Sequence, residues 1–163
     1  MKRCLLADRI PIQGSSKELV LINLHLEAYD DGEGKTAQTA MLRKILEEEK
    51  EKGNYVIAGG DFNQVFNTVD LSRFSYQEGK WKPGEVDTGS FSKGWQFLMD
   101  DTVPSCRSLD QPYLNADRDH FQYYAIDGYI VSENVIVKSF ATVQQSFVYT
   151  DHNPVLLQVE LQK

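Results

Sequence analysis

Polar side chains that could do chemistry follow or interrupt apolar segments at four places in the sequence. Aspartate and histidine can transfer protons, and aspartate oxygens can hold a divalent cation. Each place is weak evidence when taken alone, but their repeated position at the ends of expected strands indicates one polar site. The residues are Asn23, His25, Asp61, Asn63, Asp127, Asp151 and His152.

The segment 55–63 is the clearest of the four. Its first four residues form an apolar, partly β-branched run, which predicts a buried strand. Two glycines follow, and glycine allows the backbone to turn sharply or to approach a neighbour closely. The segment therefore predicts a strand that presents Asp61 and Asn63 at its carboxyl end. An Asp/Asn-rich turn without any chemistry is the alternative.

A hairpin is expected before this segment. Residues 4–13 and 19–26 are strand-like, and turn-forming residues separate them. In the second strand the even-numbered residues are apolar and form a core face, whereas Asn23 and His25 lie on the opposite face. A single histidine in such a place is more commonly structural than catalytic.

A helix is expected between the hairpin and the segment 55–63. Thr36 can cap this helix, which should run to about Lys52 with a narrow apolar stripe. The charged residues 47–52 are expected to form a solvated face, and Gly53 to take the left-handed position after the helix. The order strand, helix, strand predicts an α/β crossover that covers one side of a sheet.

The remaining chain combines an irregular part with three strands. Residues 64–122 are rich in aromatic and turn-forming residues, and we expect them to form the wall of the site with one short helix near 93–99. Asp127 falls in the middle of a strand-like run, where a carboxylate is costly unless it is paired or coordinated. The three strands are expected at 124–132, 134–143 and 155–161.

The composition is that of an ordinary globular protein of one domain. The chain has 163 residues and a net charge of -7, which argues against a broad basic surface for nucleic acid. No signal peptide and no run of about 18 apolar residues is visible, so localisation stays open with the cytoplasm as the default. Cys4 and Cys106 fit no metal-ligand spacing, and two unpaired thiols are favoured over one disulfide.

In their order along the chain, the four places resemble the endonuclease/exonuclease/phosphatase superfamily. Its members include pancreatic-type deoxyribonucleases, abasic-site endonucleases, neutral sphingomyelinases and inositol polyphosphate 5-phosphatases. The second and fourth of the matching segments are specific, and the other two gain weight from their order. The segments are Asn23-Leu24-His25-Leu26, Gly60-Asp61-Phe62-Asn63, Ile126-Asp127-Gly128-Tyr129-Ile130 and Thr150-Asp151-His152-Asn153-Pro154-Val155.

The resemblance implies a divalent-metal-dependent phosphoester hydrolase. It implies that Asp61 orients or deprotonates the attacking water, and that Asn63 hydrogen-bonds this water or a phosphate oxygen. It also implies that Asp61 and Asp151 hold the metal ion, most naturally Mg²⁺, with Mn²⁺ as the second choice.

The same resemblance assigns the two histidines. His152 is expected to be held by Asp127, which fixes its tautomer and orientation, and to contact the phosphate or act as an acid or base. His25 is expected to be a second hydrogen-bond donor on the phosphate side.

The resemblance extends over residues 19–161 and covers only part of the family domain. That domain begins with an Asn-bearing strand and soon supplies a metal-binding Glu, and neither is found in this sequence. We therefore expect residues 1–163 to be the C-terminal portion of one such domain. The fold class implied is α/β (α+β), part of a four-layer α/β/β/α sandwich with mainly one mixed sheet and a covering helix. The inner face of that sheet would need the missing half or a second copy of the chain.

The substrate class is left open by the sequence. The acidic balance and the aromatic segment 64–122 favour a small or lipid-linked phosphodiester, and DNA, as for a nuclease, is the alternative. A non-catalytic binding or scaffold fragment of the same fold is the second functional class. Binding of Mg²⁺ or Mn²⁺ that is lost on Asp151→Asn would favour the enzyme.

Overall fold

The computed structural model describes residues 5–29 and 32–162 of the chain. Short 3₁₀ helices at Leu71–Arg73, Thr88–Ser90 and Arg118–His120 lie in the irregular part. The strands and the α-helix are β1 (Leu5–Pro11), β2 (Glu18–His25), α1 (Glu33–Glu51), β3 (Tyr55–Asp61), β4 (Gln64–Phe66), β5 (Gly84–Val86), β6 (Trp95–Met99), β7 (Cys106–Arg107), β8 (Tyr123–Tyr124), β9 (Asp127–Ser132), β10 (Val135–Thr142) and β11 (Val155–Leu161).

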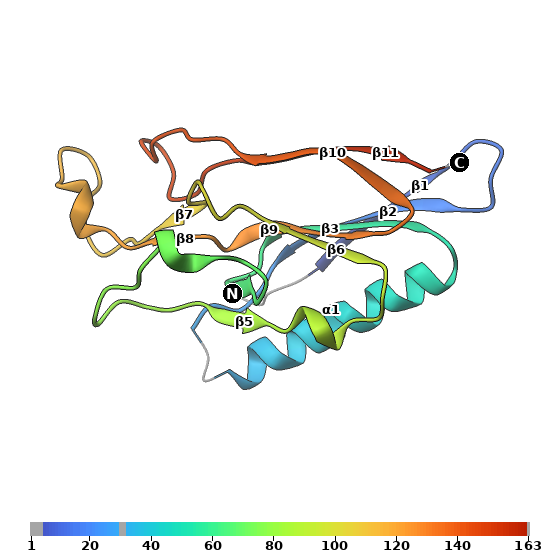
Figure 1. Cartoon of the computed structure of the whole chain (residues 1–163), viewed down its shortest axis with the longest axis horizontal. Helices are drawn as coiled ribbons and strands as arrows, with labels where there is room; N and C mark the ends of the chain where they lie inside the picture. The colour runs from blue at the N-terminus through green and yellow to red at the C-terminus, as the bar shows by residue number, and fades with distance from the viewer. Residues whose placement is uncertain (1–4, 30–31, 163) are drawn as a thin grey trace.

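A mixed five-stranded sheet in the order β1-β2-β3-β9-β6 forms the middle of the molecule. The pair β2–β3 is parallel, and the other three pairs are antiparallel. Helix α1 covers one face of this sheet, and the antiparallel hairpin β10–β11 lies over the other (Figure 1). The expected class, a mixed sheet with one covering helix, is confirmed.

The face of the sheet under α1 forms the main core. Val20, Ile22 and Leu24 alternate along β2 and are buried against the helix residues Leu42 and Leu46. This alternation is the one that the sequence predicts, because successive side chains of a strand point to opposite faces. The helix thereby fixes β2 and β3 side by side, with their carboxyl ends at the same edge.

The opposite face of the sheet is covered in part by β10 and β11. Leu21 and Ile57 on this face belong to one hydrophobic cluster with Leu157 and Val159 of β11. The expectation that the face has no partner within the chain is therefore wrong. The reason is that the last two strands pair with each other rather than joining the main sheet.

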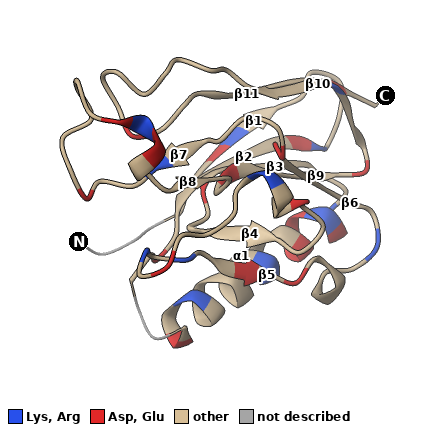
Figure 2. Ribbon diagram, turned by 60° about the vertical axis from the view of Figure 1, so that its left-hand side comes forward, with Lys and Arg blue, Asp and Glu red and all other residues tan. Residues whose placement is uncertain are grey.

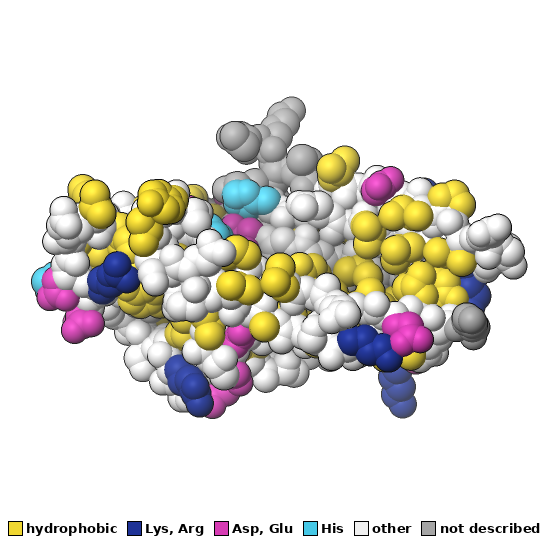
Figure 3. All heavy atoms as spheres, turned by 90° about the horizontal axis from the view of Figure 1, so that it is seen from above, with side chains coloured by type: hydrophobic (Ala, Val, Ile, Leu, Met, Phe, Trp, Pro, Cys, Tyr) yellow, Lys and Arg dark blue, Asp and Glu magenta, His cyan; other side chains and the backbone are white. Residues whose placement is uncertain are grey.

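The outer surface of the hairpin stays apolar in places. Leu156 is 59% exposed and Ile136 is 37% exposed, and they share a face because Ile136 lies opposite Glu160, four residues after Leu156. Figure 3 looks onto the molecule from the side of this hairpin and shows hydrophobic side chains gathered there. Exposed apolar patches of this kind favour association.

The chain is expected to self-associate through this surface. Sedimentation velocity over a range of concentrations should show a mass that rises with concentration, and Leu156→Lys should reduce the rise because it places a charge in the apolar contact. Leu114→Lys changes another exposed leucine and serves as the matched control. A monomer at all concentrations would contradict the prediction.

Helix α1 begins three residues before the expected cap. Gly32 stands at the N-cap with φ of 106°, and the Thr36 hydroxyl donates back to the Gly32 carbonyl at 2.8 Å. Thr36 thus lies inside the first turn, because a glycine in left-handed backbone starts the helix earlier. The end of the helix is as expected, since Gly53 has φ of 78° and donates to the Lys50 carbonyl.

The charged run at the end of α1 is not a purely solvated face. Glu49 is buried and accepts hydrogen bonds from Arg9 at 2.5 Å, Lys52 at 2.7 Å and Asn54 at 2.9 Å. Burial opposes ionisation, but these donors outweigh it and lower the pKa of Glu49 to about 2. The sequence interpretation was wrong here because the partner Arg9 comes from β1.

Two expected elements near the site also differ. Residues 95–99 form the edge strand β6, not a helix, because they pair with β9 from Trp95 opposite Ser132 to Met99 opposite Gly128. The expected strand 124–132 is broken, and Asp127 is the first residue of β9 rather than a residue in its middle. The break places the Asp127 carboxylate at the edge of the sheet.

Candidate functional site

Three neighbouring strands bring their polar residues to one edge of the sheet. In the strand register, His25 of β2 lies opposite Asp61 of β3, and Asp61 lies opposite Asp127 of β9. The His25 Nε2 atom is 3.3 Å from the Asp61 Oδ2 atom. The parallel β2–β3 pair and the antiparallel β3–β9 pair therefore build half of the site from backbone pairing alone.

The two glycines of β3 lie within the strand, not after it as expected. Gly60 has φ of 140°, and a Cβ atom there would lie 2.1 Å from the Leu24 carbonyl oxygen. At Gly59 a Cβ atom would lie 2.3 Å from the Tyr129 ring. The glycines thus allow β3 to continue between its neighbours up to Asp61, and only glycine avoids both contacts.

Asn63 fixes the Asp61 carboxylate. Its backbone N–H donates to Asp61 Oδ1 at 2.8 Å, and its Nδ2 donates to Asp61 Oδ2 at 3.1 Å and to the Leu26 carbonyl at 2.9 Å. Asn63 is 6% exposed and has φ of 49°, in the left-handed region that asparagine tolerates. Its carboxamide nitrogen therefore donates both to the Asp61 carboxylate and to the Leu26 carbonyl.

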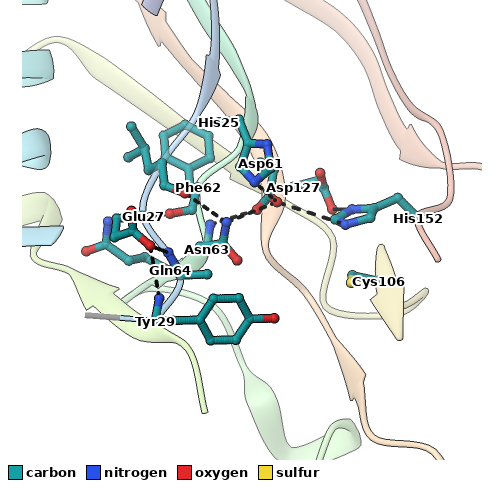
Figure 4. Close-up of polar contacts among 12 residues, drawn as sticks. His25, Glu27, Tyr29, Asp61, Phe62, Asn63, Gln64, Cys106, Asp127 and His152 are labelled. Atoms are coloured by element: carbon teal, nitrogen blue, oxygen red, sulfur yellow. Dashed lines mark hydrogen bonds and ion pairs between the residues drawn. The ribbon is translucent and has the colours of Figure 1, made fainter. Parts of the chain in front are cut away.

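His152 and Asp127 form the second half of the site. The His152 Nδ1 atom is 2.8 Å from Asp127 Oδ2, and the Ser105 hydroxyl donates to the same oxygen at 2.7 Å. The His152 Nε2 atom faces Asp61 Oδ2 at 3.9 Å. Figure 4 shows His25, Asp61, Asp127 and His152 converging from separate strands and loops.

The charges at the site influence one another. Burial, followed by the negative charge of Asp127, raises the pKa of Asp61. Burial disfavours the His152 imidazolium, but the interactions with Asp127 and Cys106 together outweigh it and raise the pKa of His152 to about 11. At neutral pH the site thus combines a carboxylate that is a stronger base than usual with a cationic imidazole.

A cavity of about 700 Å³ opens beside these residues. His25, Asp61, Asn63, Asp151 and His152 line it. The predicted aromatic wall from 64–122 is present only in part, because Trp81 lines the cavity while most other aromatic residues of this part pack into the hydrophobic clusters. Further lining residues include Tyr29, Lys80, Cys106, Arg107 and Tyr124.

Two residues at the site carry no signal in the sequence. Ser105 holds Asp127, and Cys106 is a buried free thiol on the cavity wall. Burial raises the pKa of the Cys106 thiol. Both come from the irregular part, whose short strands show no periodicity from which their position could be derived. Cys4 lies outside the described residues.

The donors around the cavity supply part of a magnesium site. Asp61 and Asp151 offer carboxylate oxygens, the ligands that Mg²⁺ prefers. Among the described residues, however, the one set of three ligands that converges within 4.8 Å is Cys106, Asp151 and His152. The carboxylates fit Mg²⁺ as two ligands and not as a complete site.

Solved structures of TDP2 share the arrangement of elements. TDP2 from D. rerio complexed with single strand DNA product matches 97% of this chain with a TM-score of 0.64 and 15% identity, over 62% of its own length. A humanized D. rerio TDP2 with 14 mutations matches 97% with a TM-score of 0.59 and 16% identity, over 61% of its length. A truncated C. elegans TDP2 matches 94% with a TM-score of 0.54 and 15% identity, over 65% of its length. The chain thus shares the fold of these TDP2 structures, which belong to the endonuclease/exonuclease/phosphatase superfamily.

The endonuclease/exonuclease/phosphatase fold is present here in part, since the chain spans less than two thirds of the length of these structures. No family model matches the chain, and no curated protein is significantly similar to it in sequence. The identities of 15–16% are too low to carry more than the fold.

In the part of the chain that the structure describes, neither the distribution of charge nor the hydropathy of the helix marks out a particular surface of the molecule. Basic and acidic positions are interspersed along the ribbon (Figure 2). Within residues 5–29 and 32–162, no helix is both long and apolar enough to cross a bilayer.

Proposed function

We propose that this chain contributes the proton-transfer half of a phosphodiester hydrolase site. The observation that carries the proposal is the convergence at one cavity of the His152–Asp127 pair, at 2.8 Å, with the Asp61 carboxylate. Hydrolysis of a phosphoester needs one group that accepts a proton from water and a second group, with a higher pKa, that donates a proton.

Asp61 is the base in this proposal. Its raised pKa suits it to accept a proton from water, and Asn63 holds the carboxylate in place through two hydrogen bonds. The His152 imidazolium, oriented by Asp127, donates to a phosphoryl oxygen or to the leaving group. His25, whose side chain is 54% exposed, offers a second donor from β2.

Asp61 and Asp151 would hold a divalent cation, most naturally Mg²⁺. Such an ion neutralises the charge that develops on the phosphoryl oxygens. Because this proposal assigns only two carboxylates, Asp61 and Asp151, to the ion, we expect this chain to hold Mg²⁺ weakly.

Single-stranded nucleic acid is the substrate class that we propose first. The similarity to a TDP2 structure complexed with single strand DNA product supports it. Tyr29, 79% exposed, and Trp81 stand on the cavity wall, where bases can stack on aromatic rings. Small and lipid-linked phosphodiesters, which the acidic composition favours, are the other candidates.

Hydrolysis by the chain alone is expected to be slow and to depend on Asp61. The assay follows an activated phosphodiester, a single-stranded oligonucleotide and sphingomyelin with Mg²⁺ or Mn²⁺. Asp61→Asn should reduce the measured rate by about 100-fold or more, because removing a general base costs a factor of this order. Asp8→Asn, an exposed carboxylate on β1, is the matched control.

Two outcomes would count against the proposal. An unchanged rate in Asp61→Asn would place the activity elsewhere. No hydrolysis of any substrate, together with no Mg²⁺ or Mn²⁺ binding sensitive to Asp151→Asn, would favour a non-catalytic binding fragment. Rapid turnover by the chain alone would contradict the expectation of a weak metal site.

A further inference from the structure

We propose that Cys106, Asp151 and His152 form a binding site for a thiophilic divalent transition metal ion, with Zn²⁺ as its representative. One ligand atom of each residue lies within 4.8 Å of the other two. A thiolate, an imidazole nitrogen and a carboxylate oxygen together suit zinc and its neighbours, whereas Mg²⁺ takes oxygen ligands. The set is thus distinct from the proposed pair of Mg²⁺ carboxylates, although it shares Asp151.

The backbone holds the three residues together. Cys106 forms a β-bridge with His152. On either side, the Arg107 N–H donates to the Asp151 carbonyl at 2.9 Å, and the Asn153 N–H donates to the Ser105 carbonyl at 2.7 Å. These contacts join two segments far apart in the sequence, so the ligands are placed by the fold rather than by a flexible loop.

His152 is already oriented for a metal ion. Its Nδ1 atom faces Asp127 Oδ2 at 2.8 Å, and the Ser105 hydroxyl holds that carboxylate. Nε2 is then the ring nitrogen left for coordination. A metal-ligating histidine usually bonds a carboxylate through its other nitrogen, which fixes the tautomer and the ring. Asp127 would be a positioning residue for the metal, not a ligand.

The site can be reached, and the Asp61 carboxylate lies beside it. All three ligands line the cavity of about 700 Å³, although Cys106 is only 6% exposed. Asp61 Oδ2 lies 3.9 Å from His152 Nε2 and adds negative charge beside a bound cation. Around a tetrahedral zinc ion, ligand atoms lie about 3.3–3.8 Å apart, so small side-chain rotations bring the three into range. A water molecule or a phosphate oxygen would complete the coordination.

Binding would displace two protons to solvent, one from the Cys106 thiol and one from the His152 Nε2 atom, because thiolate and neutral imidazole are the forms that coordinate. It would also occupy the His152 nitrogen that faces the cavity. If the chain has the proposed hydrolytic activity, Zn²⁺ should therefore inhibit that activity, whereas Mg²⁺ should support it. The binding itself does not depend on that activity and is measured without it.

The test is a titration of the reduced 163-residue chain with Co²⁺, a spectroscopic substitute for Zn²⁺. One equivalent should give a near-ultraviolet thiolate-to-cobalt absorption band, which Zn²⁺ then removes. The band should be lost in Cys106→Ser and kept in Cys4→Ser, the matched control. Asp151→Asn should weaken binding at least tenfold. Absence of the band in the parent chain, or its loss only in Cys4→Ser, would overturn the proposal.

A second measurement covers the case in which Cys106→Ser fails to fold. Alkylation of the parent chain, followed by mass spectrometry of each cysteine peptide, should become more than tenfold slower at Cys106 with Zn²⁺ present and stay unchanged at Cys4. Equal rates at Cys106 with and without Zn²⁺ would exclude the site.

Discussion

Replacing Asp127 by asparagine is expected to lower the pKa of His152 from about 11 towards the ordinary value of 6.5. The substitution keeps the burial, which disfavours the imidazolium, and removes the carboxylate that is the first of the groups raising the pKa. The titration of the histidine ring protons by NMR measures this change. Asp8→Asn should leave the His152 titration as it is, and an unchanged pKa in Asp127→Asn would contradict the role given to this pair.

The same pair makes stability depend on pH. The folded pKa of His152 lies above its unfolded value, so the stabilisation is fully present below about pH 6.5 and is lost as the pH rises towards 11. The difference in free energy of unfolding between the parent chain and Asp127→Asn should therefore be larger at pH 6 than at pH 10. Urea denaturation at the two pH values measures it, and a difference that grows with pH would have the wrong sign.

The Gly60→Ala substitution is expected to destabilise the fold by more than about 3 kcal/mol, because it combines backbone strain with overpacking. The added Cβ would lie 2.1 Å from the Leu24 carbonyl oxygen, and φ at this residue is 140°. Backbone atoms of two paired strands would have to separate, which also moves Asp61. Urea denaturation measures the loss directly.

Gly79→Ala is the matched control for this substitution. Gly79 also has a positive φ, 74°, but a Cβ atom there meets nothing within 4 Å. Only the backbone strain of about 1 kcal/mol is then expected. Equal losses in free energy of unfolding in the two variants would show that the contact with the Leu24 carbonyl does not contribute to the destabilisation.

Local patterns in the sequence were sufficient for part of the fold. The alternation of β2 and the last strand, Val155–Leu161, were predicted correctly because period-two patterns and flanking turn residues are local signals. Residues 95–99 were mistaken for a helix because their pairing with β9 is a long-range contact. The burial of Glu49 was missed for the same reason, since Arg9 is forty residues away.

In the candidate site, too, residues marked by local sequence patterns could be predicted and residues placed by long-range contacts could not. Asp61, Asp127 and His152 could be singled out from the sequence alone. They are polar residues next to apolar runs, and the segments around them resemble family segments. Ser105 and Cys106 could not, because nothing in their own segment indicates that it pairs with the segment around His152. Residues that support a site from an irregular segment are found only once the chain is folded.

The register that places Asp61 directly opposite Asp127 has a consequence for how such a sequence can evolve. Like charges facing each other across two strands oppose the pairing that holds them. A neutral residue in place of Asp61 would relieve the repulsion and would sacrifice the proposed chemistry, whereas Asp127 also pairs with His152 and stabilises the fold. Selection for stability and selection for activity therefore act in opposite directions at Asp61. A lineage released from the need for activity would lose the Asp61 carboxylate early, and would keep the glycines of β3 for as long as it kept the sheet.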